Sequence, residues 1–348
     1  MNELSNYSVT KVLVEEVVDR YDKKQDMKTV EEKKYLGQII SNDLKNEKNI
    51  KDKTNRSVGY VNKVINTLNE RPFGKFTFKA AKLMRDGILL SSLLNNSETW
   101  INLTQKNVLE LEKPDKILQE KLFQTNASKV FYYLELGILP AKYVMMKKRL
   151  TFMKYILDEP RETLIRKVFE EQRNDSRKGD FINLIEDDLK LLKIESDYNE
   201  FEQFSKSAWN KLINKKTEEV AFQNLLSENK TKSKTKSLLY EKFEMSPYLV
   251  ENSNTKVSKI IYSIRAGTLD LKYWNPWKYE DNLCVMCSIK EENIEHFMNC
   301  NSYGRKNISF KDIYKYDQEK IVEIGKEAWL RMKIREKKKV NIPVNLLP

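Results

Sequence analysis

Histidine, cysteine, glycine and proline are all scarce in this sequence of 348 residues. Glycine occupies only 9 positions and proline 8, so turns are few and the chain is expected to be mainly helical. The longest apolar runs are short, such as Ile88-Leu89-Leu90, and none approaches the roughly 20 residues that a membrane-spanning helix needs. The N-terminal stretch MNELSNYSVT is polar and lacks a signal-peptide pattern. We therefore expect an intracellular protein, nuclear or cytoplasmic, that is neither secreted nor bound to a membrane.

Residues for proton transfer and phosphoryl transfer are also missing. The single histidine is a candidate metal ligand, and no glycine-rich phosphate loop of either common spacing occurs. The pair Asp187-Asp188 lies in an amphipathic helical pattern, where paired acids usually face solvent. In YEDN (279–282), Asn282 stands where a two-metal carboxylate site needs a second acid. The sequence therefore predicts no active site and no catalytic residues on this chain alone.

What the sequence does contain is one dense cluster. All 3 cysteines and the 1 histidine lie between residues 284 and 300, with the spacing Cys-x2-Cys-x8-His-x3-Cys. Three cysteines cannot all pair as disulfides, and a reducing compartment would keep them free for metal. The last two members are four residues apart, on one face of a single helical turn. The four residues are Cys284, Cys287, His296 and Cys300.

These four ligands suit a closed tetrahedral Zn²⁺ site with no open position for a catalytic water. Such a site usually stabilises a fold that its own small core could not hold. The predicted cofactor is therefore structural zinc, and the alternative is a set of buried free thiols in a module that has lost its metal. Glu292 and Glu295 are candidates to orient the imidazole of His296.

Positive charge is in excess, with a net charge of +12. Such an excess is expected both in proteins that bind polyanions and in proteins whose charges only keep them soluble. The positions of the cations along the chain have to distinguish these two explanations. The amphipathic segment 141–157 has five cations and no anion, and it places them beside an apolar stripe. The segment 331–339, RMKIREKKK, has six cations and one anion. The candidate nucleic-acid contacts are Lys142, Lys147, Lys148, Arg149, Lys154, Arg331, Lys333 and Arg335; the alternative is that these cations only solvate the surface.

Other segments complete the expected organisation. A strand is predicted near 34–41, and helices are predicted over 45–68, 79–100, 104–122, 141–157, 162–174, 181–193 and 203–226. The stretch SENKTKSKTKS (227–237) has no apolar anchor and is predicted to be an exposed linker between domains. Aromatic residues precede the cysteine cluster, and they are candidates either to stack on unpaired bases or to pack against the metal module. They are Tyr273, Trp274, Trp277 and Tyr279.

Four landmarks resemble the C-terminal part of non-LTR (LINE-type) retrotransposon reverse transcriptases. They are VEEKKYLGQIIS (30–41), NSETW (96–100), YLELGILPAKYVMMKKRLTFMKYIL (133–157) and DNLCVMCSIKEENIEHFMNC (281–300), in the order of that family. The resemblance covers roughly residues 30–305. The fingers and palm of the family, with their Tyr-x-Asp-Asp sequence, do not occur in this chain, so polymerase activity is not carried over.

The resemblance implies a helical thumb-like bundle followed by a small zinc-knuckle module. The expected segments are a palm or connector remnant (1–34), the thumb-like domain (35–226), the basic linker (227–237), the zinc-knuckle domain (238–305) and a basic C-terminal tail (306–348). The expected function is non-catalytic binding of RNA or DNA, as structured RNA or a template–primer duplex. The alternatives are a zinc-containing protein-interaction module, a non-functional transposon relic, and a part that completes a separately encoded palm domain in trans.

Overall fold

The computed structural model describes residues 32–35, 38–41, 46–69, 77–101, 103–175, 179–250, 255–314 and 318–340. The chain is mainly helical, as predicted from its few glycines and prolines. Near the predicted strand, two short strands, β1 (Glu32–Tyr35) and β2 (Gln38–Ser41), pair antiparallel with Glu32 opposite Ser41. No helix in the described ranges is long and apolar enough to span a membrane. The predicted remnant at 1–34 lies outside the described residues apart from 32–34.

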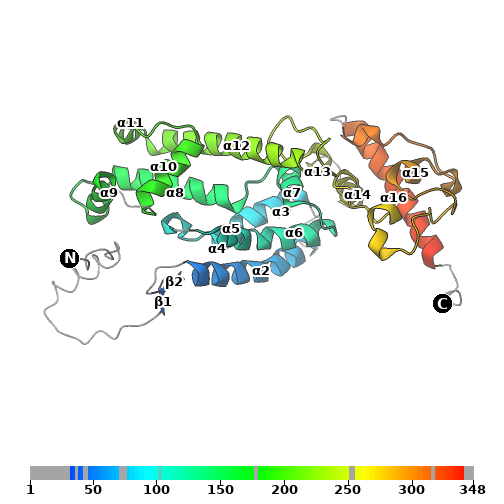
Figure 1. Cartoon of the computed structure of the whole chain (residues 1–348), viewed down its shortest axis with the longest axis horizontal. Helices are drawn as coiled ribbons and strands as arrows, with labels where there is room; N and C mark the ends of the chain where they lie inside the picture. Colours follow the sequence, from blue (N-terminus) through cyan, green and yellow to red (C-terminus); the bar gives the residue numbers. More distant parts are fainter. Residues whose placement is uncertain are drawn as a thin grey trace. The chain divides into compact units, whose positions relative to one another are not determined.

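Helices make up most of the described chain (Figure 1). They are α2 (Glu47–Asn69), α3 (Phe78–Met84), the π-helix η2 (Arg85–Leu90), α4 (Ser91–Leu93), η3 (Ser97–Thr99), α5 (Gln105–Leu111), α6 (Lys113–Phe123), α7 (Lys129–Leu136), α8 (Ala141–Asp158), α9 (Leu164–Asn174), α10 (Phe181–Leu191), α11 (Tyr198–Gln203), α12 (Lys206–Lys230), α13 (Pro247–Val250), α14 (Thr255–Arg265), η4 (Lys272–Trp274), η5 (Pro276–Lys278), α15 (Ile294–Asn299), η6 (Asn301–Tyr303), η7 (Lys311–Tyr314) and α16 (Gln318–Val340).

The chain divides into two compact units, which are described separately. Unit 1 comprises Met1–Asn49, Asn96–Thr104 and Met146–Ile213, and unit 2 comprises Ile50–Asn95, Gln105–Met145 and Asn214–Pro348. The unit boundaries fall inside α2, α8 and α12, so this division differs from the predicted one, which separates domains at 227–237. That segment lies within unit 2 and is held there by buried hydrogen bonds of Asn229 and Thr235.

Unit 1 is built around the C-terminal half of α8. Trp209 of α12 is fully buried and donates its indole N–H to the carbonyl oxygen of Leu150, at 3.0 Å. Arg149 of α8 donates to the Asp188 carboxylate of α10 at 2.8 Å. Burial raises the pKa of Asp188 to about 6, although the Arg149 guanidinium acts in the opposite direction. The amphipathic pattern therefore forms a helix as predicted, but two of its cations, Arg149 and Lys154, are buried.

Unit 2 has an aromatic core shared by α3, α6 and α14. The ring centroid of Phe123 lies 5.0 Å from that of Phe78 and 3.6 Å from that of Tyr262. The Phe123 ring is stacked on both of these rings. Helices α14 and α16 pack against each other. A Cβ at Gly325 of α16 would lie 2.4 Å from Cγ1 of Ile261, so the close approach of the two helices requires a glycine there.

The segment ELGILP (135–140) joins several elements of unit 2. Glu135 of α7 is fully buried, and its carboxylate accepts hydrogen bonds from Arg265 at 3.0 Å, Tyr240 at 2.8 Å and Tyr248 at 2.7 Å. Burial raises the pKa of both tyrosines well above the usual value, and the Glu135 charge adds to the effect. Gly137 ends α7 with a φ of +55°, and a Cβ there would lie 2.4 Å from the backbone carbon of Glu244. This segment therefore has a structural role.

Candidate metal centre

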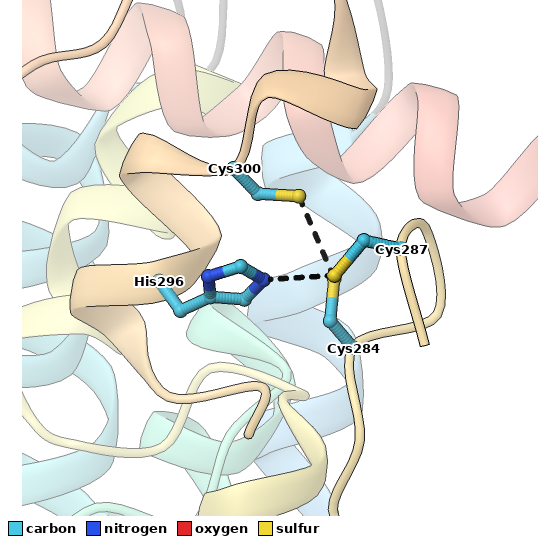
Figure 2. A group of neighbouring side chains, drawn as sticks. All are labelled: Cys284, Cys287, His296 and Cys300. Carbon is cyan, nitrogen blue, oxygen red and sulfur yellow. Dashed lines mark hydrogen bonds between the residues drawn. The ribbon is translucent and has the colours of Figure 1, made fainter. Parts of the chain in front are cut away.

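The four cluster residues predicted as ligands point toward one another (Figure 2). Their ligand atoms all lie within 4.8 Å of one another. The sulfurs of Cys284 and Cys300 are 3.9 Å apart, and the Cys287 sulfur is 3.3 Å from Nε2 of His296. Tetrahedral zinc, with bonds of about 2.3 Å to sulfur and about 2.0 Å to nitrogen, sets its ligands about 3.5–3.8 Å apart. The residues therefore fit a four-coordinate metal ion.

The first two ligands lie in a tight hairpin, residues 282–292, which we call the cysteine hairpin. The backbone N–H of Cys284 donates to Lys290 at 2.8 Å, and that of Glu292 donates to Asn282 at 2.7 Å. Ser288 directly follows the second cysteine and has a φ of +55°, in the left-handed region, which lets the chain reverse there. These backbone hydrogen bonds help the hairpin to aim two thiols at one point.

Backbone amides also act on the sulfurs themselves. Burial raises the pKa of the Cys284 thiol to about 11. Burial acts in the same direction on Cys287, but hydrogen bonds from the backbone N–H groups of Lys290 and Ile289 outweigh it and lower its pKa to about 6. Donors that face a sulfur favour the thiolate, the form that binds a metal ion.

The other two ligands belong to α15. Asn293 caps the helix by accepting a hydrogen bond from the backbone N–H of His296 at 2.8 Å. Cys300 follows the last helical residue, so one short helix carries both ligands on one face. Phe297 and Met298 of the same helix are fully buried in the core of unit 2. Their burial fixes the helix, and with it the direction of the imidazole and the thiol.

Arg331 of α16 supports the second pair of ligands from behind. Its side chain is 0% exposed and donates to the carbonyl oxygens of Phe297 at 2.9 Å and Cys300 at 3.1 Å. It also donates to the carbonyl of Lys306 at 2.9 Å and pairs with Glu327 at 3.0 Å. A guanidinium carries five donors in a fixed plane, which suits it to gather several carbonyls at once.

Arg335, one turn further along α16, supports the cysteine hairpin. Its guanidinium makes two hydrogen bonds, of 2.8 and 2.6 Å, to the carboxylate of Glu292. That carboxylate also accepts the backbone N–H of Lys272 at 3.0 Å and of Val285 at 3.3 Å. Glu292 was a candidate to orient His296, but in the structure its carboxylate instead joins α16 to the hairpin. Glu295, the other candidate, is exposed.

The cations predicted along α8 are divided between surface and interior. Lys142 is exposed and its ammonium lies 4.8 Å from the ring centroid of Tyr143, while Lys147 and Lys148 are half-buried. Arg149 and Lys154 are buried, with Asp188 and Asp158 as their acidic partners. Asp188 is largely buried and Asp158 is exposed, so each of these two buried cations already has an acidic partner on the chain.

The predicted basic C-terminal tail, 306–348, also contains both buried and exposed cations. Residues 318–340 form the long helix α16, while 315–317 and 341–348 lie outside the described residues. Lys333 is exposed, with its ammonium 3.8 Å from the ring centroid of Trp329. Arg331 and Arg335 are buried and hydrogen-bonded, so neither guanidinium faces solvent where a phosphate would bind.

The sequence does carry a signal for this burial, which the predictions missed. The two arginines continue the stripe of Ile321, Ile324 and Ala328, because they step by three and four residues from it. All five positions are buried. Cations in phase with an apolar stripe indicate a buried role rather than a basic arm.

The four aromatic residues before the cluster do not share one environment. Tyr279 donates to Asp270 at 2.9 Å and lies beside Arg335, and Trp274 is half-buried against the core. Tyr273 is exposed, and Trp277 is 79% exposed. Two of the four therefore pack against the metal module and two face solvent.

No family model matches this chain, and comparisons with curated proteins and with solved structures gave no match. The resemblance to LINE-type reverse transcriptases therefore stays a prediction from the motifs. What the structure itself supports is a helical protein with a cluster of three cysteines and one histidine that could hold a metal ion.

Proposed function

We propose that the metal is Zn²⁺ and that its role is structural. Three sulfurs and one imidazole nitrogen are the donor set that favours zinc, and four protein ligands fill a tetrahedral site. The surroundings support the same role, because Arg331 and Arg335 connect both halves of the ligand set to α16. A bound ion would thus stabilise the packing of the C-terminal part of unit 2.

We further propose that the protein binds nucleic acid without catalysis. The observation that carries this proposal is the distribution of charge. Each buried arginine of the described residues pairs with at least one carboxylate, so these pairs add nothing to the net charge. The chain's net charge of +12 therefore resides outside them, mainly on lysines. The pairs are Arg85–Asp115, Arg149–Asp188, Arg166–Glu202, Arg265–Glu135, Arg331–Glu327 and Arg335–Glu292.

The test is binding of the purified, zinc-loaded chain to a labelled RNA hairpin and to an RNA–DNA primer–template. We expect tight binding at about 50 mM salt and a loss of several orders of magnitude at about 200 mM, because phosphate contacts release counterions. Anisotropy gives both affinities. No binding at the lower salt concentration would contradict the proposal. Primer extension by the chain alone, with controls for contaminating polymerase, would contradict its non-catalytic part.

A second candidate, a protein-interaction module, is favoured by exposed apolar side chains in the metal module. Trp277 is 79% exposed and Ile289, in the cysteine hairpin, is 76% exposed. Large apolar side chains at the surface are typical of binding sites when they lie together. Absence of RNA binding together with stable binding to a protein partner, lost on Trp277→Ala, would favour this candidate.

A further inference from the structure

We propose that residues 230–237, here called the lysine loop, form an ordered contact surface for the phosphate backbone of RNA or DNA. The inference rests on the proposed nucleic-acid binding and names the surface that carries it. The loop begins at Lys230, the last residue of α12, and has the sequence KTKSKTKS, in which every second residue is a lysine. From Asn229 to Tyr240 the chain contains no acidic residue.

The lysine loop is held in place by a buried anchor. Asn229 and Thr235 are both buried, and the Asn229 side-chain amide donates to the Thr235 carbonyl at 2.9 Å. The Thr235 hydroxyl donates back to the Asn229 side chain at 2.6 Å. Within the loop, the backbone N–H groups of Lys232, Thr235 and Lys236 donate to carbonyls three or four residues before them. The segment predicted as an exposed linker is therefore anchored by Asn229 and Thr235 and turns on its own backbone hydrogen bonds.

One loop lysine also fixes the loop to its neighbour in unit 2. The ammonium of Lys234 donates to the carbonyl of Gly267, just after α14, at 3.1 Å. Its aliphatic chain lies against the same glycine, where a Cβ would approach Lys234 carbons within 3.1–3.3 Å. Gly267, with a φ of +64°, thus accepts the hydrogen bond of Lys234 through its carbonyl and, having no Cβ, leaves room for the aliphatic chain of that lysine.

The remaining lysines face solvent. Lys230 and Lys236 are exposed and have no ion-pair partner among the described residues. Lys232 forms an ion pair with Glu228, at 3.2 Å from its ammonium to the carboxylate. The exposed residue Ser233 lies between Lys230 and Lys236, and the exposed residue Ser237 directly follows Lys236. Ammonium and hydroxyl donors are the groups that contact phosphate oxygens without reading sequence. Because the loop is already ordered, binding loses little conformational entropy there.

The test removes the two unpaired charges. Lys230→Gln with Lys236→Gln should weaken binding to the labelled RNA hairpin at about 50 mM salt. The slope of log affinity against log salt should fall in magnitude by about one for each lysine. The matched control is Lys206→Gln with Lys211→Gln, which removes the same charge from exposed positions of α12 and should change the slope far less.

Each outcome separates the two proposals. If the unsubstituted chain binds and the loop variant matches the α12 control, the lysine loop is not the contact surface, although nucleic-acid binding stands. If the unsubstituted chain does not bind at all, both proposals fail. If the loop variant alone loses affinity and slope, the assignment is supported.

A second variant tests the order of the loop independently of its charge. Asn229→Ala removes the anchor and keeps every lysine, so affinity should fall several-fold while the salt slope stays unchanged. Circular dichroism of this variant checks that the helices remain. Unchanged affinity in a folded Asn229→Ala variant would show that the order of the loop does not contribute.

Discussion

At the scale of single residues, two buried arginines of α16 connect the metal ligands to the rest of unit 2. Arg331 binds the carbonyl of a ligand, Cys300, and Arg335 binds Glu292, which ends the cysteine hairpin. Both guanidiniums are at most 1% exposed. A charge buried this deeply is stable only when it is paired and hydrogen-bonded. Removing one partner leaves the other charge buried without compensation, which lowers the free energy of unfolding.

We predict that Arg335→Met destabilises the protein by about 3–5 kcal/mol, because it leaves the Glu292 carboxylate buried without a cation. The companion variant, Arg335→Met with Glu292→Gln, should recover part of this loss. Urea denaturation of the zinc-loaded proteins measures both. A loss below about 1 kcal/mol for the single substitution would mean that the pair is more solvated than its geometry indicates.

At the scale of elements, helix ends and helix contacts depend on a few backbone positions. Gly137 ends α7 in the left-handed region and lies against the backbone of Glu244. Gly59 lies in the middle of α2, and a Cβ added there would have no other atom within 4 Å. The same substitution should therefore have opposite effects at the two sites.

We predict that Gly137→Ala lowers the free energy of unfolding by at least about 2 kcal/mol, through the left-handed φ and the clash with Glu244. Gly59→Ala should be neutral or stabilise by up to about 1 kcal/mol, because alanine favours the helix. Thermal unfolding compares the two variants directly. Equal effects would contradict the account of the α7 end.

The contact between α8 and α10 should make stability depend on pH. Burial raises the pKa of Asp188 to about 6 in the folded state, above its ordinary value of 3.8. The folded state therefore binds this proton more tightly than the unfolded state. The resulting stability is present below about pH 4 and is lost as pH rises through about 6.

We predict that the free energy of unfolding of the unsubstituted protein, relative to Asp188→Asn, falls by up to about 3 kcal/mol between about pH 4 and about pH 7. The comparison removes the contributions of other groups, which titrate in both proteins. Urea denaturation across this range measures the difference. A difference that stays constant with pH would show that Asp188 keeps an ordinary pKa in the fold.

At the scale of the whole molecule, the metal centre connects three stretches of unit 2: the cysteine hairpin, α15 and α16. Loss of the ion should therefore affect more than the immediate surroundings of the ligands. Since Arg331 and Arg335 join α16 to both ligand pairs, α16 should loosen together with residues 275–305.

We predict that Cys284→Ser abolishes zinc binding and increases amide exchange over 275–305 and in α16, while α9 and α10 of unit 1 stay protected. Elemental analysis measures the metal, and hydrogen exchange measured by mass spectrometry gives the pattern along the chain. Ser288→Ala, in the same hairpin, is the control that should retain zinc. Exchange confined to residues 284–300 would contradict the coupling to α16, and loss of protection everywhere would contradict the independence of unit 1.

The helical class and the candidate metal ligands followed from the sequence by itself, for a physical reason. Helical periodicity and the spacing His-x3-Cys are short-range properties, so 17 neighbouring residues define the ligand set before any tertiary contact forms. The roles of the cations were decided only by the tertiary structure. Arg149 depends on Asp188 and Arg335 on Glu292, 39 and 43 residues away, and Lys234 depends on a carbonyl 33 residues away. A cation has the same side chain whether it meets solvent, a buried carboxylate or a phosphate, and only the fold decides which of these lies beside it.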